Sequence, residues 1–235
     1  MPDLLVSSIF DTDVAFIGGS ETDVRVAESN HRIANNLTLV SGMLRLQAAE
    51  ARAKERALSR DDISCLLLEA AARIETVGRL HGRLASGEEE LPLADILREV
   101  AEGTVASLAR PGQAQLALRL SQGVTAPARP ALSIALAVGE LITNSLKYAH
   151  PAGVPCQIVV SCRQGAAASL EVEVCDDGIG LPEGLDPTMS GGLGLKLVRA
   201  LAQQMGADLS FEDIGVGLAV RLRLSRPGPA KGCQA

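Results

Sequence analysis

The chain has 235 residues, of which 47% are hydrophobic, so it is long enough to bury the core of one or two domains. Its formal net charge of −6 and its aromatic content of only 2% exclude the basic, aromatic surface that is usual in nucleic-acid-binding proteins. We therefore expect no nucleic-acid partner.

The cysteines and the first residues bear on the cellular compartment. None of the five cysteines forms a CxxC pair, so we expect reduced, mostly buried thiols in a reducing compartment. No apolar run approaches the ~20 residues that span a bilayer. Asp3, Asp11 and Asp13 stand where a signal peptide would be basic. These features predict a soluble, cytoplasmic protein without membrane insertion.

The first part of the chain has a helical pattern. Residues 1–21 show no clear pattern and are left unassigned. Heptad-spaced apolar residues run from 22 to 59, and a second such helix follows from 62 to about 85. Two long amphipathic helices with a short connection predict an antiparallel hairpin over 22–88. A lone hairpin cannot cover both apolar seams, so we expect a homodimer in which two hairpins form a four-helix bundle.

The remainder of the chain has a mixed pattern. The polar stretch SGEEELP, residues 86–92, marks the expected domain boundary. Residues 91–225 alternate helical and strand patterns, which predicts an α/β domain whose consecutive strands pair antiparallel. Its expected helices are 93–109, 129–149 and 195–205. Its expected strands are 114–120, 156–162, 169–175, 207–212 and 217–224. Residues 226–235 have the composition of a disordered tail.

A polar stripe interrupts the first helix, although asparagine is a poor residue for a helix interior. Glu28, His31, Asn35 and Thr38 are spaced 3, 4 and 3, so they share one face beside the apolar seam. One interpretation is a solvated face with an incidental histidine. The other is an imidazole nucleophile whose neighbours hold its ring and handle its proton.

The helix over 129–149 is apolar nearly all round, with one narrow polar stripe. Glu140, Thr143, Asn144 and Lys147 lie at i, i+3, i+4 and i+7. Burying a carboxylate or amide without a partner costs several kcal/mol, so the stripe indicates a partner. The hard oxygens of Glu140 and Asn144 suit Mg²⁺, whereas internal hydrogen bonding to the backbone is the alternative.

Two glycine-containing stretches follow in a set order. SLEVEVCDDGIGLP is an alternating strand that ends in a turn, and SGGLGLKLV then opens a helix. Glycines at 191, 192 and 194 let backbone N–H groups approach a ligand, and a helix N-terminus favours phosphate. Neither stretch is a P-loop or a strand-linked GxGxxG motif, so each alone is a weak signal.

The order of these stretches resembles the ATP-binding domain of the GHKL superfamily, which includes histidine kinases, Hsp90-type chaperones, type II topoisomerases and MutL-type ATPases. The resemblance covers roughly residues 93–225 and implies a Bergerat-type α/β sandwich. The matching residues are Glu140, Asn144 and Lys147 in the first motif, Asp176, Gly178 and Gly180 in the second, and Gly192 and Gly194 in the third.

The GHKL resemblance implies a role for each motif. Asp176 would accept a hydrogen bond from the adenine amino group of ATP, and Asn144 would bind Mg²⁺. The backbone from Gly192 to Leu195 would hold the triphosphate.

The helical hairpin resembles the dimerisation and phosphoacceptor helices of two-component sensor histidine kinases, in the group marked by HRxxN. Here that motif is His31, Arg32, Ile33, Ala34 and Asn35. The resemblance implies that His31 takes the γ-phosphoryl group of ATP and passes it to an aspartate of a response-regulator receiver domain. His81 lies on the apolar seam, and we interpret it as a packing residue.

Some positions depart from this pattern. Arg32 stands where many histidine kinases carry an acidic residue, so Glu28 or Glu140 is the expected proton acceptor. Residues 181–190 form a short loop without aromatic residues, which predicts a small ATP lid. No sensor domain precedes the hairpin, so we expect input from a separate sensory protein. Asn35, one turn after His31, is the expected group for orienting water during dephosphorylation of the regulator.

Two rival functions remain on the sequence alone. One is a histidine phosphotransferase or response-regulator phosphatase of the same fold, but both glycine motifs of the nucleotide site are present. The other is an ATP-driven conformational clamp, which would use the same nucleotide site without His31.

Overall fold

The computed structural model describes residues 38, 40–49, 51–52, 57–85, 90–150, 154–166, 169–182 and 184–225. The chain divides into two compact units, Met1–Glu89 and Glu90–Ala235. Among the described residues, no helix is both long enough and apolar enough to cross a membrane.

The first unit contains a turn between two helical stretches. Residues 40–49 and 51–52 are helical, and α3 (Arg60–Ala85) follows. Ser59 and Asp62 cap α3 reciprocally, because Asp62 N donates to Ser59 Oγ and Ser59 N donates to Asp62 Oδ2. Gln47 joins the two stretches by donating to Leu66 O and accepting from the Arg73 guanidinium.

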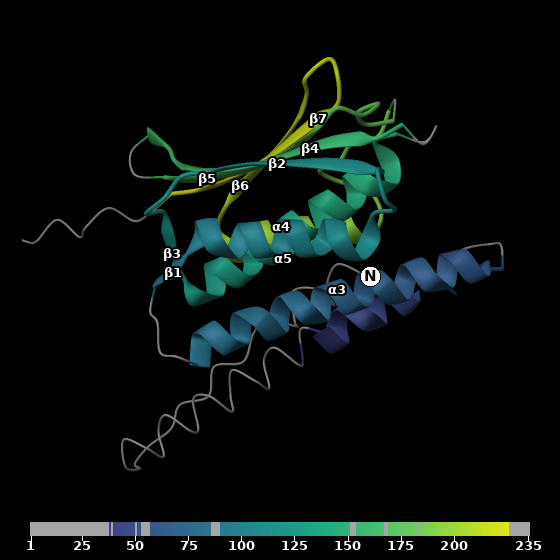
Figure 1. Ribbon diagram of the computed structural model, residues 1–235, viewed down its shortest axis with the longest axis horizontal. Coiled ribbons are helices and arrows are strands. Elements are labelled where there is room, and N and C mark those ends of the chain that lie inside the picture. The colour runs from purple at the N-terminus through teal and green to yellow at the C-terminus, as the bar shows by residue number, and fades with distance from the viewer. Residues whose placement is uncertain are drawn as a thin grey trace, which may run out of the picture. The chain divides into compact units, whose positions relative to one another are not determined.

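The second unit is a layer of helices on one face of a sheet (Figure 1). Its helices are α4 (Leu93–Leu108), α5 (Ala128–Tyr148) and α6 (Leu193–Met205). Its strands are β1 (Glu90–Pro92), β2 (Ala114–Leu120), β3 (Thr125–Pro127), β4 (Cys156–Gln164), β5 (Leu170–Asp176), β6 (Asp208–Asp213) and β7 (Leu218–Leu224). The five-stranded sheet has the order β2-β4-β5-β7-β6, and β1 and β3 form a separate two-stranded pair.

The core of this unit lies between the sheet and its helices. Alternate residues of β4 and β5 are buried, as a strand with one covered face requires: Ile158, Val160, Cys162, Val172 and Val174. The opposite face carries charged cross-strand pairs, in which Glu173 binds Arg221 and Glu171 binds both Arg163 and Arg223. The sheet therefore has one apolar face, which the helices cover, and one charged face.

Two sequence expectations about strands were wrong. β2 and β4 pair parallel rather than antiparallel, because the chain between them passes through α5 and returns in the same direction. β1 and β3, which pair antiparallel, were not expected. Each has three residues and ends in proline, so neither shows the alternation by which strands are identified.

Candidate functional site

Asp176, the last residue of β5, is held by donors from three segments. Ser145 Oγ in α5 donates a 2.8 Å hydrogen bond to Oδ2. The backbone N–H of Gly178 donates to Oδ1 at 3.0 Å, and that of Leu218 approaches the same oxygen at 3.4 Å. These bonds orient a half-buried carboxylate, which still has lone pairs for a donor on a ligand.

Two glycines allow the loops to close around the end of β5. A Cβ at Gly178 would lie 2.4 Å from Ala149 Cα, and Ile179 N donates to Ala149 O at 2.9 Å. Gly217 has a φ of +96°, and a Cβ there would lie 1.8 Å from the carbonyl oxygen of Asp176. Both approaches exclude any side chain, so glycine is required at each position.

The polar stripe of α5 lies in the same unit. Glu140 is buried, and Thr143 Oγ1 donates to Gly139 O within the helix. Asn144 Nδ2 is buried and has no hydrogen-bond partner among the described residues. Because an unpaired buried amide costs ~1–3 kcal/mol, this atom indicates where a ligand group belongs. Lys147 is exposed one turn further along α5.

The glycine turn before α6 meets this stripe. A Cβ at Gly194 would lie 3.1 Å from both Asn144 Oδ1 and Glu140 Oε2. The structure thus brings together two motifs that are about fifty residues apart in the chain, as the sequence analysis expected. The absence of a side chain at Gly194 leaves the Asn144 amide facing the start of α6.

The first turn of α6 is arranged to receive an anion. Gly192 occupies the N-cap position, and no side chain caps the helix there. Gly191 has a φ of +118°, and a Cβ on it would lie 2.7 Å from Leu195 Cδ1. Backbone N–H groups at a helix N-terminus favour phosphate oxygens.

Gly180 closes the turn after β5. Its φ is +72°, and a Cβ there would lie 3.8 Å from Gly217 O and 3.9 Å from Asp213 Oδ2. Asp176, Gly178 and Gly180 therefore stand along one turn, next to the β6–β7 connection.

The loop between the two glycine turns is tied to α6. The Arg199 guanidinium donates to Pro187 O at 2.8 Å and to Ser190 O at 2.7 Å. Thr188 donates through both its hydroxyl and its backbone N–H to Asp186 Oδ1, and these bonds lower the pKa of Asp186 below its ordinary value. The described part of loop 181–190 is thus anchored at its C-terminal end.

Sequence reasoning missed several groups of this site. Ser145 follows Asn144 directly, so it lies about 100° from the polar stripe that spacing had marked. Tertiary packing alone brings Arg199 into contact with the loop 181–190 and the N–H of Leu218 to Asp176. The glycine turn of GVGLAV was visible in the sequence, but nothing local indicated that Gly217 touches Asp176.

A second cluster of polar groups lies in the segments that follow α5 and β5, next to Asp176 in the chain. His150 Nε2 lies 2.8 Å from Asp177 Oδ1, and Gln157 N donates to the same oxygen at 2.8 Å. Partial burial alone would raise the pKa of Asp177, but the bonds from His150 and Gln157 lower it below the ordinary value. This cluster was not expected from the sequence.

The candidate residues of the helical hairpin cannot be placed. Glu28, His31 and Asn35 lie outside the described residues. His81 belongs to α3.

The donors on α5 fit a hard cation. Glu140 and Asn144 present a carboxylate and an amide side by side, and both face Gly194. Rotation of the amide exchanges Nδ2 for Oδ1, so the position with the unpaired atom can offer an oxygen. Mg²⁺ prefers one or two such oxygens together with phosphate and water.

Two family profiles match the chain. "Histidine kinase-, DNA gyrase B-, and HSP90-like ATPase" matches residues 130–228, and "Histidine kinase" matches residues 28–108. The first match contains every residue of the candidate site on α5, β5 and α6 described above, and the second contains His31.

Several known proteins are similar to the chain. The sensor histidine kinase PdtaS of Mycobacterium tuberculosis is 30% identical, over 88% of this chain and 40% of its own length. The blue-light-activated histidine kinase 2 of Erythrobacter litoralis is 28% identical, over 86% of this chain and 57% of its own length. The chain thus spans about two fifths and just under three fifths of these two relatives.

A solved structure has the same architecture. The histidine kinase domain of the Erythrobacter litoralis blue-light-activated kinase EL346 superposes with a TM-score of 0.66. The sequences are 26% identical, and the match covers 88% of this chain and 93% of that domain.

Proposed function

The chain belongs to the histidine kinases and carries their GHKL-type ATPase domain, and from this premise we propose that it phosphorylates its own His31 from Mg-ATP. The phosphoryl group would then pass to an aspartate of a response-regulator receiver domain. The family and the α/β sandwich confirm the resemblance drawn from the sequence, whereas the roles of individual residues are proposals.

The buried, unpaired amide of Asn144 carries the nucleotide part of the proposal. It stands beside Glu140 and faces the glycine turn at Gly194. A buried polar atom is stable when a ligand satisfies it. A nucleoside triphosphate with its cation would offer a hydrogen-bond acceptor to the Asn144 amide and a positive charge to the Glu140 carboxylate.

Each end of the nucleotide has a proposed partner in this chain. Asp176, oriented by Ser145, would accept from the adenine amino group. The first turn of α6, from Gly192 to Leu195, would donate backbone N–H groups to the phosphates. Asn144 and Glu140 would hold Mg²⁺, which neutralises phosphate charge when bound, and Lys147 would add positive charge nearby.

The transfer step would use His31 as the nucleophile. A neutral imidazole nitrogen attacks the γ-phosphorus, and the bond to the bridging oxygen breaks with its electron pair leaving on ADP. The ring proton then passes to Glu28 or Glu140. The attack requires the neutral imidazole, because only an unprotonated ring nitrogen has a lone pair for the new bond to phosphorus.

The test follows label from γ-labelled ATP. Wild type should gain acid-labile, alkali-stable label, as phosphohistidine does, and His31→Gln should gain none. His81→Gln is the matched control and should label like wild type. Undiminished labelling of His31→Gln, or label mapped to His81, would contradict the proposal.

ATP binding separates the kinase from its rivals. His31→Gln should keep its ATP affinity, whereas Asp176→Asn should lose roughly 10- to 100-fold, since a hydrogen bond to a charged group is worth ~1.5–3 kcal/mol. Asn144→Asp should impair the use of Mg-ATP. An ATP-driven clamp would hydrolyse ATP equally well without His31.

Asn35→Ala should slow only dephosphorylation of the regulator.

A further inference from the structure

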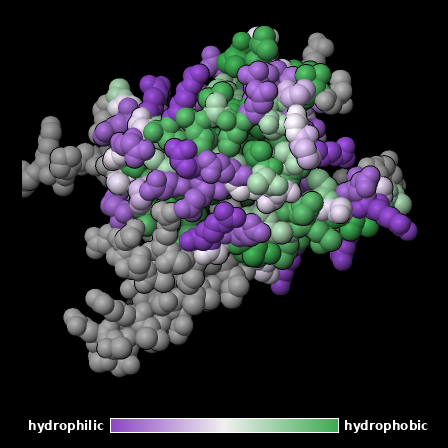
Figure 2. Space-filling model, viewed as in Figure 1, coloured by the Kyte–Doolittle hydropathy of each residue, from purple (hydrophilic) through white to green (hydrophobic). Residues whose placement is uncertain are grey.

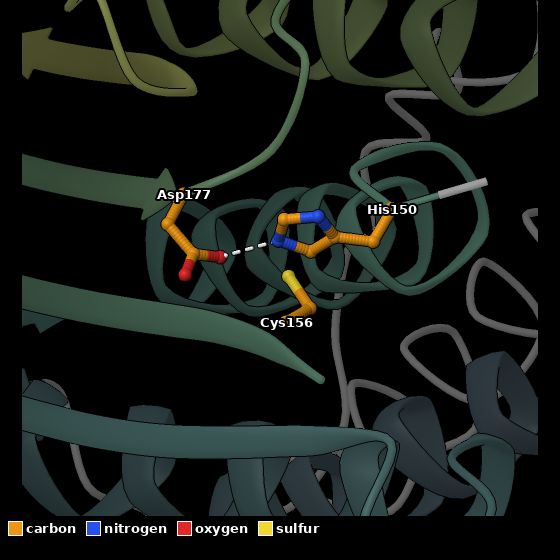
Figure 3. A group of neighbouring side chains, drawn as sticks. All are labelled: His150, Cys156 and Asp177. Carbon is orange, nitrogen blue, oxygen red and sulfur yellow. Dashed lines mark hydrogen bonds and ion pairs between the residues drawn. The ribbon is translucent and has the colours of Figure 1, made fainter. Parts of the chain in front are cut away.

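Three side chains that could ligate a metal point toward one another (Figure 3). They are His150, which follows α5, Cys156, which opens β4, and Asp177, which follows β5. One ligand atom from each, an imidazole nitrogen, a thiol sulfur and a carboxylate oxygen, lies within 4.8 Å of the other two. We propose that His150, Cys156 and Asp177 form a binding site for Zn²⁺.

The donor set selects the cation. Thiolate and imidazole are the ligands that zinc prefers, and carboxylate is its common oxygen ligand. Mg²⁺ and Ca²⁺ are bound by oxygen and would leave the Cys156 sulfur without a role. Three protein ligands leave one of the four tetrahedral positions for water.

The distances need only a small adjustment. Zinc bonds are ~2.0–2.3 Å long, so tetrahedral ligand atoms lie within 4 Å of one another. The His150 and Asp177 atoms are 2.8 Å apart and would separate slightly to admit the ion. The three ligand atoms, which lie within 4.8 Å of one another, would close to within ~4 Å around it. Asp177 Oδ1 would remain fixed by the N–H of Gln157.

The exposure of the three side chains suits an ion that arrives from solvent. Cys156 is buried, whereas the side chains of His150 and Asp177 are partly exposed, 19% and 36%. The sulfur thus forms the closed inner wall of the site, and the other two ligands border its open side.

A cysteine nucleophile does not explain this cluster. Burial, together with the nearby charges of Asp176 and Asp177, raises the pKa of the Cys156 thiol to about 12. A reactive cysteine has the opposite shift. On zinc binding the thiol proton leaves to solvent, and the sulfur bonds the metal as thiolate.

A zinc ion bound to this cluster would also affect the candidate nucleotide site at Asp176. His150, Cys156 and Asp177 come from the segment after α5, the start of β4 and the segment after β5, and Ile179 N already bonds Ala149 O between the first and the last of these. A bound ion would tie these segments together and stabilise the folded unit. The zinc site does not depend on the proposed kinase activity, since it uses none of the nucleotide-site residues.

The test is metal binding by the full chain after treatment with a chelator. Wild type should take up one equivalent of Zn²⁺ at micromolar concentration and melt at a higher temperature when loaded. Co²⁺ as a spectroscopic probe should show a thiolate-to-metal charge-transfer band. Cys156→Ser should lose this band and the zinc-dependent rise in melting temperature.

A second variant and a matched control complete the test. His150→Gln changes a partly exposed side chain, and it should also lose zinc binding even if Cys156→Ser folds poorly. Cys162→Ser replaces another buried cysteine of β4 that is not in the cluster, and it should bind zinc like wild type. A wild type that takes up no Zn²⁺ or Co²⁺, or a His150→Gln variant that binds zinc like wild type, would overturn the proposal. Those outcomes would leave His150 and Asp177 as a hydrogen-bonded pair only.

Discussion

Ser145 Oγ donates a 2.8 Å hydrogen bond to Asp176 Oδ2, and this bond joins α5 to the end of β5. The same hydroxyl lies 3.2 Å from Leu141 O in its own helix. Ser145 is buried, so its hydroxyl has no access to water as an alternative partner. It therefore sets the direction in which the Asp176 carboxylate faces.

We predict that Ser145→Ala weakens ATP binding several-fold. Loss of one hydrogen bond that orients a charged acceptor is worth about 1–2 kcal/mol, although alanine is the better helix former. Calorimetric titration with ATP measures the change. Ser133→Ala is the matched control on α5, because Ser133 is also buried but donates a long, 3.4 Å hydrogen bond to Gln204 of α6. Equal affinities in the two variants would show that Ser145 does not orient Asp176.

We predict that Gly194→Ala abolishes the use of ATP while the unit stays folded. The new methyl group would stand 3.1 Å from Asn144 Oδ1 and Glu140 Oε2, in the space where these groups face α6. Gly139→Ala is the matched control, because its Cβ would make only ordinary 3.7 Å contacts with Thr104 and Val100. As a helical glycine, Gly139 should gain ~0.5–1 kcal/mol of stability on that change.

Circular dichroism and labelling from ATP would be measured for both glycine variants. Normal labelling of Gly194→Ala would mean that the turn does not hold the triphosphate. Unfolding of Gly139→Ala would contradict the packing described around α5.

The sequence predicted the features that a short stretch of residues encodes. A buried helix with one polar stripe marks Glu140 and Asn144 by spacing alone, and the glycines at 191, 192 and 194 mark the turn that faces them. Strand direction has no such local signature, so the parallel pairing of β2 with β4 was missed. The bond between Ser145 and Asp176 spans 31 positions of the chain and depends on how α5 packs against β5, which no periodicity reports.

We predict that stability declines in alkali partly through Cys162. Burial raises the pKa of its thiol from 9.0 to about 11, so between these values the unfolded chain loses this proton while the folded chain keeps it. The stabilisation is therefore complete below pH 9 and is lost as the pH rises through 11. One thiol contributes a slope of about −1.4 kcal/mol per pH unit to the free energy of unfolding.

Denaturant unfolding between pH 8 and 11 would measure this slope, and Cys162→Ala should make it shallower. Val160→Ala, which truncates the neighbouring inward-facing side chain of β4, should lower stability by a similar amount at every pH. An unchanged slope in Cys162→Ala would contradict the prediction.

We predict that the chain dimerises through an apolar stripe on α3. Ile63, Leu67 and Ile74 share one face of the helix and are 47%, 66% and 46% exposed within the single chain. Hydrophobic surface is visible along the described helices of the first unit in Figure 2, beside hydrophilic side chains. Such a stripe is stable in water when a second copy covers it.

Light scattering would report the mass of the wild type and of Leu67→Glu, which should be a dimer and a monomer respectively. Leu68→Glu is the matched control, because Leu68 is also exposed but points about 100° away from Leu67. A monomeric wild type, or equal dissociation by both substitutions, would refute a dimer interface on this stripe.

Arg199 anchors the loop that precedes α6. Its guanidinium donates to the carbonyls of both Pro187 and Ser190. Met189, between them, is 80% exposed and contributes little packing of its own. The order of this part of the loop thus depends on charge-assisted hydrogen bonds, which one planar side chain supplies. Arg199→Ala should speed amide hydrogen exchange at 188–190 and raise the KM for ATP, while exchange in β5 stays slow. Lys196→Ala removes an exposed positive charge from the same helix and should leave loop exchange unchanged, so it separates the bonds from the charge. If exchange at 188–190 is the same in Arg199→Ala and wild type, then the turn formed by Asp186 and Thr188 is sufficient to order the loop, and Arg199 has no anchoring role.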